Sequence, residues 1–454
     1  MFMANVIEAI WAPESDEFAR HSIRAGAMSA LELYDAVAGR RMEFVGYAGH
    51  HTNCNLLLTS GCSHRIRGRK LVGCSMCDYH SSNLEGWALM RALLKKDPEL
   101  YARAVRTSFE AVRPDRPAPA FCEQVTGNDC LDPVEFPPQA LEVLFQGDGL
   151  FAKNPRCYMF EVLASHVTKR SVAEFSRRFS RGQTLFFDFG VEATDWLRRH
   201  WINKECGDDQ VASAIRVLRE AGHYSVADVL IGIPGVTEEQ SVRAFLDTMR
   251  LLDALGVDRV FCLPLNRKRK TLQGFLHERL GQNDRLGALG LSQGEHTGVP
   301  WLFTIVEALC RAFEELPTLR GRLKLAAIRS DQVVIENRLA YNANAACACN
   351  EQIVAAFERY QKSGEPAHIF AVREGGSDCG CREAYDRIIR KQTQAGPLAE
   401  TLATLADEIA QELFPADWEA LVQSFREELR LLPSEEASSS HNIQNVTAVS
   451  INSF

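Results

Sequence analysis

The chain has 454 residues, 46% hydrophobic and 24% charged, which predicts a globular protein with one large domain or two. Its net charge of -8 argues against a dedicated nucleic-acid-binding protein, because such proteins carry a basic footprint. Residues 1–20 lack the basic and apolar regions of a signal peptide, and no run of about 18 apolar residues occurs, so we expect a cytoplasmic protein with no membrane partner.

Apolar runs of strand length alternate with amphipathic segments up to residue 280. The predicted strands cover residues 56–58, 118–125, 157–163, 184–189, 224–231 and 259–265. The predicted helices cover residues 84–94, 138–145, 172–179, 208–221, 238–255 and 272–280, with a polar amphipathic stretch at 194–201. This alternation indicates a parallel sheet with right-handed crossovers. The predicted fold class is therefore α/β, a partial (β/α)6 barrel with an α-rich C-terminal extension.

Four regions follow from this pattern. We expect an N-terminal helical extension at 1–41, the barrel at 42–282, a C-terminal α/β region at 283–432 and a disordered tail at 433–454. Within the third region, residues 299–313, 398–413 and 418–431 are predicted helices and residues 324–339 a hairpin. The tail is rich in Ser, Asn and Glu, a composition typical of disorder.

Three cysteines, Cys62, Cys74 and Cys77, lie on one loop directly after the first predicted strand. Three closely spaced thiols with no fourth beside them suit a [4Fe–4S] cluster that leaves one iron open to an exogenous ligand. The alternative is structural zinc, which needs a fourth ligand, either Cys54 or His64. A disulfide is disfavoured, because three cysteines cannot all pair and fourteen cysteines in a reducing compartment favour metal ligands and buried thiols.

Loops after three later strands carry glycines or a carboxylate, at the strand ends where parallel α/β sheets bind ligands. Gly127, before Asn128, allows close approach of the backbone to a ligand, or forms a plain turn. Glu192 can accept hydrogen bonds from a ribose hydroxyl or an amino group, or serve as a helix N-terminal carboxylate. Gly232 to Gly235, with Pro234 between them, fix a tight turn against which a flat adenine could pack.

These motifs resemble the radical S-adenosylmethionine (SAM) superfamily, and most closely the branch of the Elongator catalytic subunit's radical domain and the archaeosine synthase radical subunit. The resemblance covers over half of the chain, roughly residues 42–280. It rests on four stretches, which are Ser60 to Cys62 with Gly73 to Tyr79, Leu131 to Glu135, Phe189 to Glu192 with Asp195, Arg198 and Ile202 to Lys204, and Ile231 to Gln240.

The resemblance implies that Cys62, Cys74 and Cys77 ligate a [4Fe–4S] cluster and that the amino and carboxylate groups of SAM chelate its open iron. One electron then breaks a sulfur–carbon bond, usually giving methionine and a 5′-deoxyadenosyl radical. By position, Gly127 and Asn128 line the methionine amine, Glu192 the ribose, and Gly232, Pro234 and Gly235 the adenine. Arg170 is the first candidate for the methionine carboxylate and Lys204 the second. An electron donor such as flavodoxin or ferredoxin is the implied protein partner.

Two further cysteine pairs, Cys347 with Cys349 and Cys379 with Cys381, lie outside the barrel pattern. Four thiols can hold a zinc ion or an auxiliary iron–sulfur cluster, and unpaired thiols are the alternative. Packing is the expected role of the cysteines in apolar runs, which are Cys54, Cys122, Cys157, Cys206, Cys262 and Cys310.

A radical SAM enzyme acting on a small molecule is the leading hypothesis, because the chain is acidic and shows no nucleic-acid module. A tRNA-modifying enzyme is the alternative, with local basic charge at residues 64–70 and 267–270. The second alternative is a non-catalytic metal-binding scaffold, which the carboxylate at position 192 and the glycine turn disfavour. The sequence identifies neither the substrate nor a catalytic residue.

Overall fold

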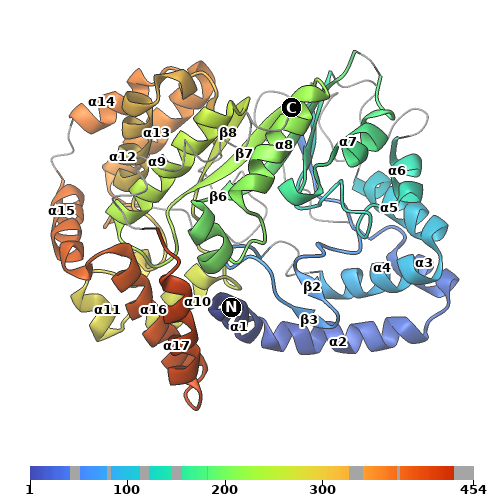
Figure 1. The fold of residues 1–454 in the computed structure, drawn as a ribbon, viewed down its shortest axis with the longest axis horizontal. Helices are drawn as coiled ribbons and strands as arrows, with labels where there is room; N and C mark the ends of the chain where they lie inside the picture. The colour runs from blue at the N-terminus through green and yellow to red at the C-terminus, as the bar shows by residue number, and fades with distance from the viewer. Residues whose placement is uncertain are drawn as a thin grey trace.

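The computed structural model describes residues 1–40, 52–78, 83–112, 122–145, 156–180, 182–326, 341–375 and 379–433. At its centre is a parallel sheet whose strands lie side by side in chain order (Figure 1). These strands are β1 (Thr52–Asn55), β4 (Cys122–Val125), β5 (Cys157–Glu161), β6 (Thr184–Glu192), β7 (Tyr224–Ile231), β8 (Arg259–Pro264) and β9 (Leu323–Leu325). A small antiparallel hairpin, β2 (Ile66–Arg67) with β3 (Lys70–Leu71), lies within the cysteine loop.

Each connection between neighbouring strands of the sheet contains at least one helix. These helices are α4 (Leu84–Lys96), α5 (Pro98–Val112), α6 (Pro138–Phe145), α7 (Lys169–Ser176), α8 (Asp208–Glu220), α9 (Glu238–Leu255), α10 (Leu272–Leu280), α11 (Asp284–Ala288) and α12 (Leu302–Glu315). A parallel sheet in strict chain order, with a helical crossover at every step, is an open form of the β/α barrel. The predicted partial barrel is therefore confirmed.

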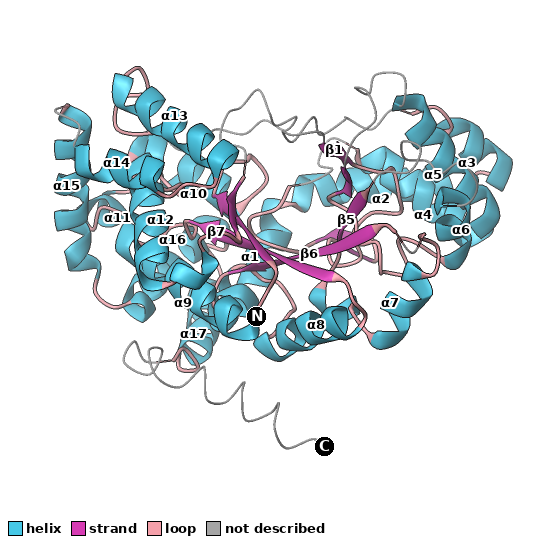
Figure 2. Ribbon diagram, turned by 90° about the horizontal axis from the view of Figure 1, so that it is seen from above, coloured by secondary structure: helices cyan, strands magenta, loops and turns pink. Residues whose placement is uncertain are grey.

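Further helices stand before and after the barrel. The N-terminal ones are α1 (Phe2–Ile10), α2 (Ala12–Ala27) and α3 (Ala30–Val37), and the C-terminal ones are α13 (Ala348–Ser363), α14 (Ala367–Gly375), α15 (Gly380–Gln392), α16 (Leu398–Leu413) and α17 (Trp418–Leu429). Helices α2 to α7 gather at one end of the sheet and α9 to α16 at the other (Figures 1 and 2). Within the described residues, every helix is too short or too polar to cross a membrane.

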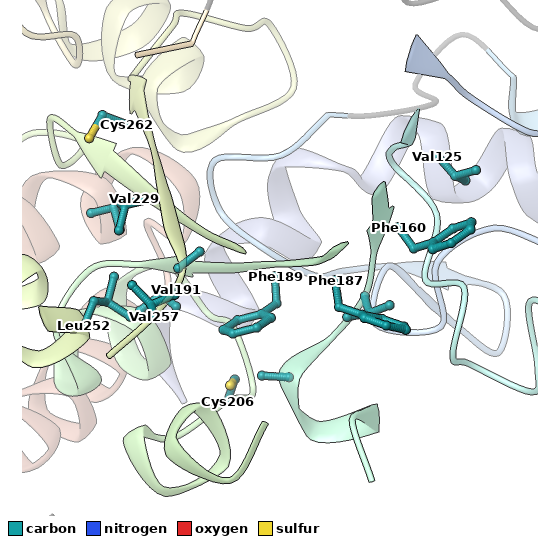
Figure 3. Close-up of a cluster of buried hydrophobic side chains, with 14 of the residues drawn as sticks. Val125, Phe160, Phe187, Phe189, Val191, Cys206, Val229, Leu252, Val257 and Cys262 are labelled. Carbon is teal, nitrogen blue, oxygen red and sulfur yellow. The ribbon is translucent and has the colours of Figure 1, made fainter. Parts of the chain in front are cut away.

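Side chains alternate between the two faces of the sheet, as the period of a strand requires. On β6 and β7, Phe187, Phe189, Val191 and Val229 belong to one buried apolar cluster with side chains of the covering helices (Figure 3). Full burial of each such side chain contributes about 1.5–3 kcal/mol. Because residues at even positions of these two strands point the other way, Asp188 and Asp228 share the inner face. A bulge between Gly190 and Glu192 brings the Glu192 carboxylate over the same face.

Three expectations need correction or fall outside the described residues. The first strand is β1, at Thr52–Asn55, and the apolar run predicted as a strand at residues 56–58 is a buried loop after it. These residues are apolar because they are buried under helices, not because they pair with a neighbouring strand. The barrel has a seventh strand, since Leu323–Leu325 pairs in parallel with β8. Residues 327–340, where the rest of the hairpin was predicted, and the predicted tail from residue 434 are not described.

Candidate cofactor-binding site

The cysteine loop is held in shape by a buried arginine. Arg65 is 3% exposed, and its guanidinium donates hydrogen bonds to the carbonyl oxygens of Val72, Cys74 and Cys77. The same guanidinium lies over the ring of Trp11, 4.5 Å from its centroid, so an N-terminal helix junction covers the loop. One buried cation therefore fixes the backbone at two of the three candidate ligands.

The loop is also attached to the segment that follows β6. The Ser75 amide donates to the Ile202 carbonyl at 2.7 Å, and the Ser75 hydroxyl donates to the Trp201 carbonyl at 3.0 Å. The Asn203 side-chain amide donates to the Gly73 carbonyl at 2.8 Å. A ring nitrogen of His64 lies 2.8 Å from the Asn203 carbonyl. Motifs more than a hundred residues apart in sequence thus meet at the cysteine loop.

The three thiols do not converge on a single point. Two groups of three or more candidate metal ligands in the described chain have all their ligand atoms within 4.8 Å of one another, and Cys62, Cys74 and Cys77 are not one of them. A zinc ion with bonds of about 2.3 Å cannot link sulfurs more than about 4.6 Å apart. At least one pair of the three sulfurs is therefore more than 4.8 Å apart, a spacing that a polynuclear cluster can span.

The alternative fourth ligands have other partners. The Cys54 thiol donates to the side-chain oxygen of Gln124, and His64 is turned to the Asn203 carbonyl. Burial is the main cause that raises the pKa of both Cys62 and Cys74, and the charge of Lys204 acts in the opposite direction on Cys74. Binding of a metal must therefore supply the energy to deprotonate these thiols.

Glu192 and Lys204 form a buried ion pair beside the loop. The Lys204 ammonium donates to Glu192 Oε1 at 2.8 Å, and the second carboxylate oxygen, Oε2, is buried with no partner among the described residues. A bulge between Gly190 and Glu192, with φ of +64° at Glu192, turns this carboxylate out of the strand register. A side chain at Gly190 would meet both charged groups and displace them, so glycine leaves room for the ion pair. Glu192 thus keeps one acceptor available for a ligand.

The predicted methionine-amine residues have different environments. Gly127 takes φ of +69°, and its amide donates to Glu161 Oε2 at 2.6 Å. Asn128 uses its side chain to bond both backbone groups of Leu57 and one oxygen of Glu135. Asn128 therefore joins the loop after β1 to the loop after β4 instead of presenting its amide to a ligand.

Glu135 is the buried centre of that junction, and sequence reasoning assigned it no role. Its carboxylate accepts from Thr59 and Asn128 on one oxygen and from the Asp129 amide on the other. Burial raises the pKa of Glu135 to about 8. The only sequence signal for Glu135 was its place in Leu131 to Glu135, one of the four stretches that carry the resemblance.

The candidate adenine turn is tied to the same segment after β6. The indole nitrogen of Trp201 donates to the Pro234 carbonyl at 3.0 Å. Gly232 takes φ of +105°, and a side chain there would collide with Pro300. Gly235 takes φ of +83° against Leu276. The turn is therefore a rigid surface at the carboxyl end of β7.

The two residues predicted to bind the methionine carboxylate lie in different places. Arg170 lies on the surface of α7, with 87% of its side chain exposed, and pairs with Glu174 one turn further on. The structure therefore does not bring Arg170 to the cysteine loop. Lys204, the second candidate, lines a cavity of about 230 Å³ together with Ser63 and His64 of the cysteine loop and Ser165 and His166 of the loop after β5.

Glu238 in the first turn of α9 provides a pH-dependent test of this region. It accepts hydrogen bonds from the Thr304 hydroxyl and the Trp301 amide, and burial raises its pKa from 4.5 to about 7. A raised pKa means that its stabilising contribution is complete below about pH 4.5 and is lost as the pH rises through about 7. The free energy of unfolding of Glu238→Gln, relative to wild type, should therefore rise by up to about 3 kcal/mol between pH 5 and pH 8.

Urea unfolding at the two pH values measures this difference. Glu239→Gln is the matched control, because Glu239 is its exposed neighbour and pairs with Arg243 and Arg311 on the surface. A difference for Glu238→Gln that is the same at both pH values would show that this carboxyl group does not titrate in the fold.

The four C-terminal cysteines do converge. The ligand atoms of Cys347, Cys349, Cys379 and Cys381 all lie within 4.8 Å of one another. Cys347 and Cys379 are the N-cap residues of α13 and α15, so each Cys-x-Cys pair spans the start of a helix. A side-chain amide of Asn342 also donates to the Cys349 sulfur at 3.4 Å. Four sulfurs at this spacing match the tetrahedral coordination of one zinc ion.

A scan against protein-family models finds no match, and a search of curated proteins finds none. Solved structures similar to this one include TsrM from Kitasatospora setae, a radical SAM methyltransferase with tryptophan and a SAM analogue bound. It has 14% identity and a TM-score of 0.38, with 74% of this chain and 62% of that chain covered.

Two others are HemN from Escherichia coli, a coproporphyrinogen III oxidase described as a radical SAM enzyme, and Elp3 from Methanocaldococcus infernus with an N-terminal deletion. HemN has 14% identity, a TM-score of 0.36 and coverage of 63% of this chain and 55% of that one. Elp3 has 12% identity, a TM-score of 0.36 and coverage of 60% of each chain. This chain thus spans less than two thirds of each of the three proteins.

Proposed function

We propose that the protein is a radical SAM enzyme that modifies a small-molecule substrate. The observation that carries the proposal is the meeting of the three-cysteine loop with the Glu192–Lys204 ion pair at the carboxyl ends of the strands. The wide spacing of the three thiols supports a cluster over a single zinc ion, and a buried carboxylate oxygen beside the loop has no partner among the described residues.

When bound, a [4Fe–4S] cluster would supply the one-electron chemistry that side chains lack, with SAM as its co-substrate. Cys62, Cys74 and Cys77 would hold the cluster, and Arg65 keeps their loop rigid. Glu192 would accept a hydroxyl or ammonium hydrogen from SAM through its second oxygen. The Gly232 to Gly235 turn would cover the adenine. Lys204 stands where it can attract a carboxylate.

A small-molecule substrate is favoured over tRNA, because most basic residues of the two basic stretches form ion pairs within the protein. Lys70 pairs with Glu8, Lys270 with Glu14 and Arg67 with Glu205. Arg267 and Lys268 are mostly buried and pair with Glu295 and Asp78. Phosphate binding depends on cations that are not already neutralised. The basic stretches predicted from the sequence therefore serve mainly to attach loops and N-terminal helices.

The C-terminal cysteines are proposed to bind one structural zinc ion, because their ligand atoms satisfy the spacing of a single tetrahedral ion. The division into regions at residues 41, 282 and 432 stays a prediction.

Anaerobic reconstitution tests the proposed function. The purified chain, loaded with iron and sulfide and reduced with dithionite, should convert SAM to methionine and 5′-deoxyadenosine, detected by mass spectrometry. A mobility shift with bulk tRNA at low and high salt tests the alternative substrate class. Cluster binding without any cleavage of SAM contradicts the enzymatic proposal, and tight salt-resistant tRNA binding contradicts the small-molecule substrate.

A further inference from the structure

The inner face of the barrel carries four carboxylates on three adjacent strands. Glu161 ends β5, Asp188 and Glu192 lie on β6, and Asp228 lies on β7. Glu161 pairs with Asp188 in the strand register, and Asp228 pairs with Gly190. The opposite faces of these strands carry the apolar cluster of Figure 3, which fixes the carboxylates on the inside.

Asp188 and Asp228 interact directly. Asp228 pairs in register with Gly190, two residues after Asp188 on the same face, so the two carboxyl groups are neighbours and repel each other when both are ionised. Burial, with the charge of Glu161, raises the pKa of Asp188 to about 8, and burial with the charge of Asp188 raises that of Asp228 well above its usual range. Asp188 is 3% exposed, yet its Oδ1 has no hydrogen-bond partner among the described residues.

The negative charge of this face is not neutralised locally. Lys204 is the cation that acts on both aspartates, and its ammonium is bound to Glu192. Glu161 is engaged with the Thr126 hydroxyl and the Gly127 amide. The other titratable group that faces Asp228 is the buried Cys262 thiol, which is not a cation. Buried like charges without counter-charge are costly, and such arrangements occur at functional sites.

We propose that Asp188 and Asp228 receive a positively charged nitrogen of the substrate, an ammonium or a guanidinium group. The proposal rests on the proposed function, in which SAM occupies the loops at the strand ends. Asp188 lies four residues before Glu192 on β6, and therefore deeper in the barrel than the residues assigned to SAM. A cationic group there would give Asp188 Oδ1 its missing donor and offset the repulsion between the carboxylates.

Thermal unfolding of the reconstituted protein with SAM bound provides the test, with three probes of one size. Pentylamine is the cation, pentanol the neutral isostere and pentanoate the anion. We expect pentylamine at millimolar concentration to raise the Tm by a few degrees, and pentanol and pentanoate to leave it unchanged. Asp188→Asn should lose the response to pentylamine. Asp247→Asn, a surface carboxylate on α9 paired with Arg250, is the matched control and should keep it.

Two further measurements decide between a substrate site and the alternatives. Asp188→Asn without ligands should have a higher Tm than wild type at pH 8, because the uncharged amide removes the repulsion from Glu161 and Asp228. A lower Tm would identify a structural pair and overturn the proposal, as would no amine-specific shift in wild type.

SAM affinity, measured by equilibrium dialysis, separates the two sources of positive charge, since SAM itself carries an ammonium and a sulfonium. It should stay within threefold of wild type in Asp188→Asn, and a large loss would assign the carboxylates to SAM. Failure of the proposed function is distinct, because wild type would then bind no SAM at all.

Discussion

Replacement of Cys62, Cys74 or Cys77 by alanine, one at a time, should abolish both the iron–sulfur cluster and the cleavage of SAM. Wild type is expected to hold about four iron atoms per chain in this cluster, with a broad brown absorption, because three thiolates fix three corners of the cube. Loss of one corner removes one of the three anchors that hold the cluster to the protein. Formation of 5′-deoxyadenosine should fall by at least about 10³-fold, the scale on which loss of a required catalytic group acts.

Cys310→Ala is the matched control for this experiment. Cys310 is fully buried in α12, packed in the apolar core and remote from the cysteine loop in the fold. Its replacement costs packing energy and should leave the iron content unchanged. Iron content and colour that survive in any of the three loop variants would show that this cysteine is not a ligand.

Much of the barrel was predictable, because helix boundaries are encoded locally. The helix Glu238–Leu255 has the predicted bounds, with Thr237 as its N-cap and Gly256, at φ of +68°, as its C-cap. Short strands carry less local information. The first strand lies at Thr52–Asn55 and not at residues 56–58, and the pairing of the three-residue β9 with β8 was not predicted.

The position of the cofactor loops was predictable for a topological reason. The loops after β1, β6 and β7 meet because parallel strands present their carboxyl ends at one edge of the sheet. The individual partners in these loops were not predictable. Arg170 and Lys204 both follow strands, and only the fold shows that Arg170 faces solvent while Lys204 pairs with Glu192.

The pairing of buried polar residues also could not be predicted from the sequence. Asp188 and Asp228 are separated by forty residues, and each looks like an interruption of an apolar strand. Their meeting depends on which face of each strand is internal and on the register of β6 with β7. Glu135 likewise acquires its role through contacts with Thr59 and Asn128, which lie on two different loops. Such long-range register is fixed by tertiary packing, not by any local pattern.

Zinc is the second test with a large expected effect, and it concerns stability rather than chemistry. Purified wild type should contain one zinc ion per chain, and Cys379→Ser or Cys347→Ser should contain none. Structural zinc contributes an apparent free energy of about 10–16 kcal/mol in small zinc-binding peptides, so its loss should melt the helices it joins, α13 and α15. Helical circular dichroism should then show an early unfolding transition that wild type and Cys310→Ala lack.

Unfolding of α15 should also disturb the Gly232 to Gly235 turn, because two residues of α15 contact residues that lie near this turn. The Tyr385 hydroxyl lies 3.1 Å from that of Thr304, and the Gln392 side-chain oxygen accepts from the Glu238 amide at 2.9 Å. We therefore expect Cys379→Ser to keep its [4Fe–4S] cluster but to bind SAM more weakly. Four additional iron atoms in place of zinc would identify an auxiliary cluster, and unchanged zinc in both variants would show that these cysteines are not its ligands.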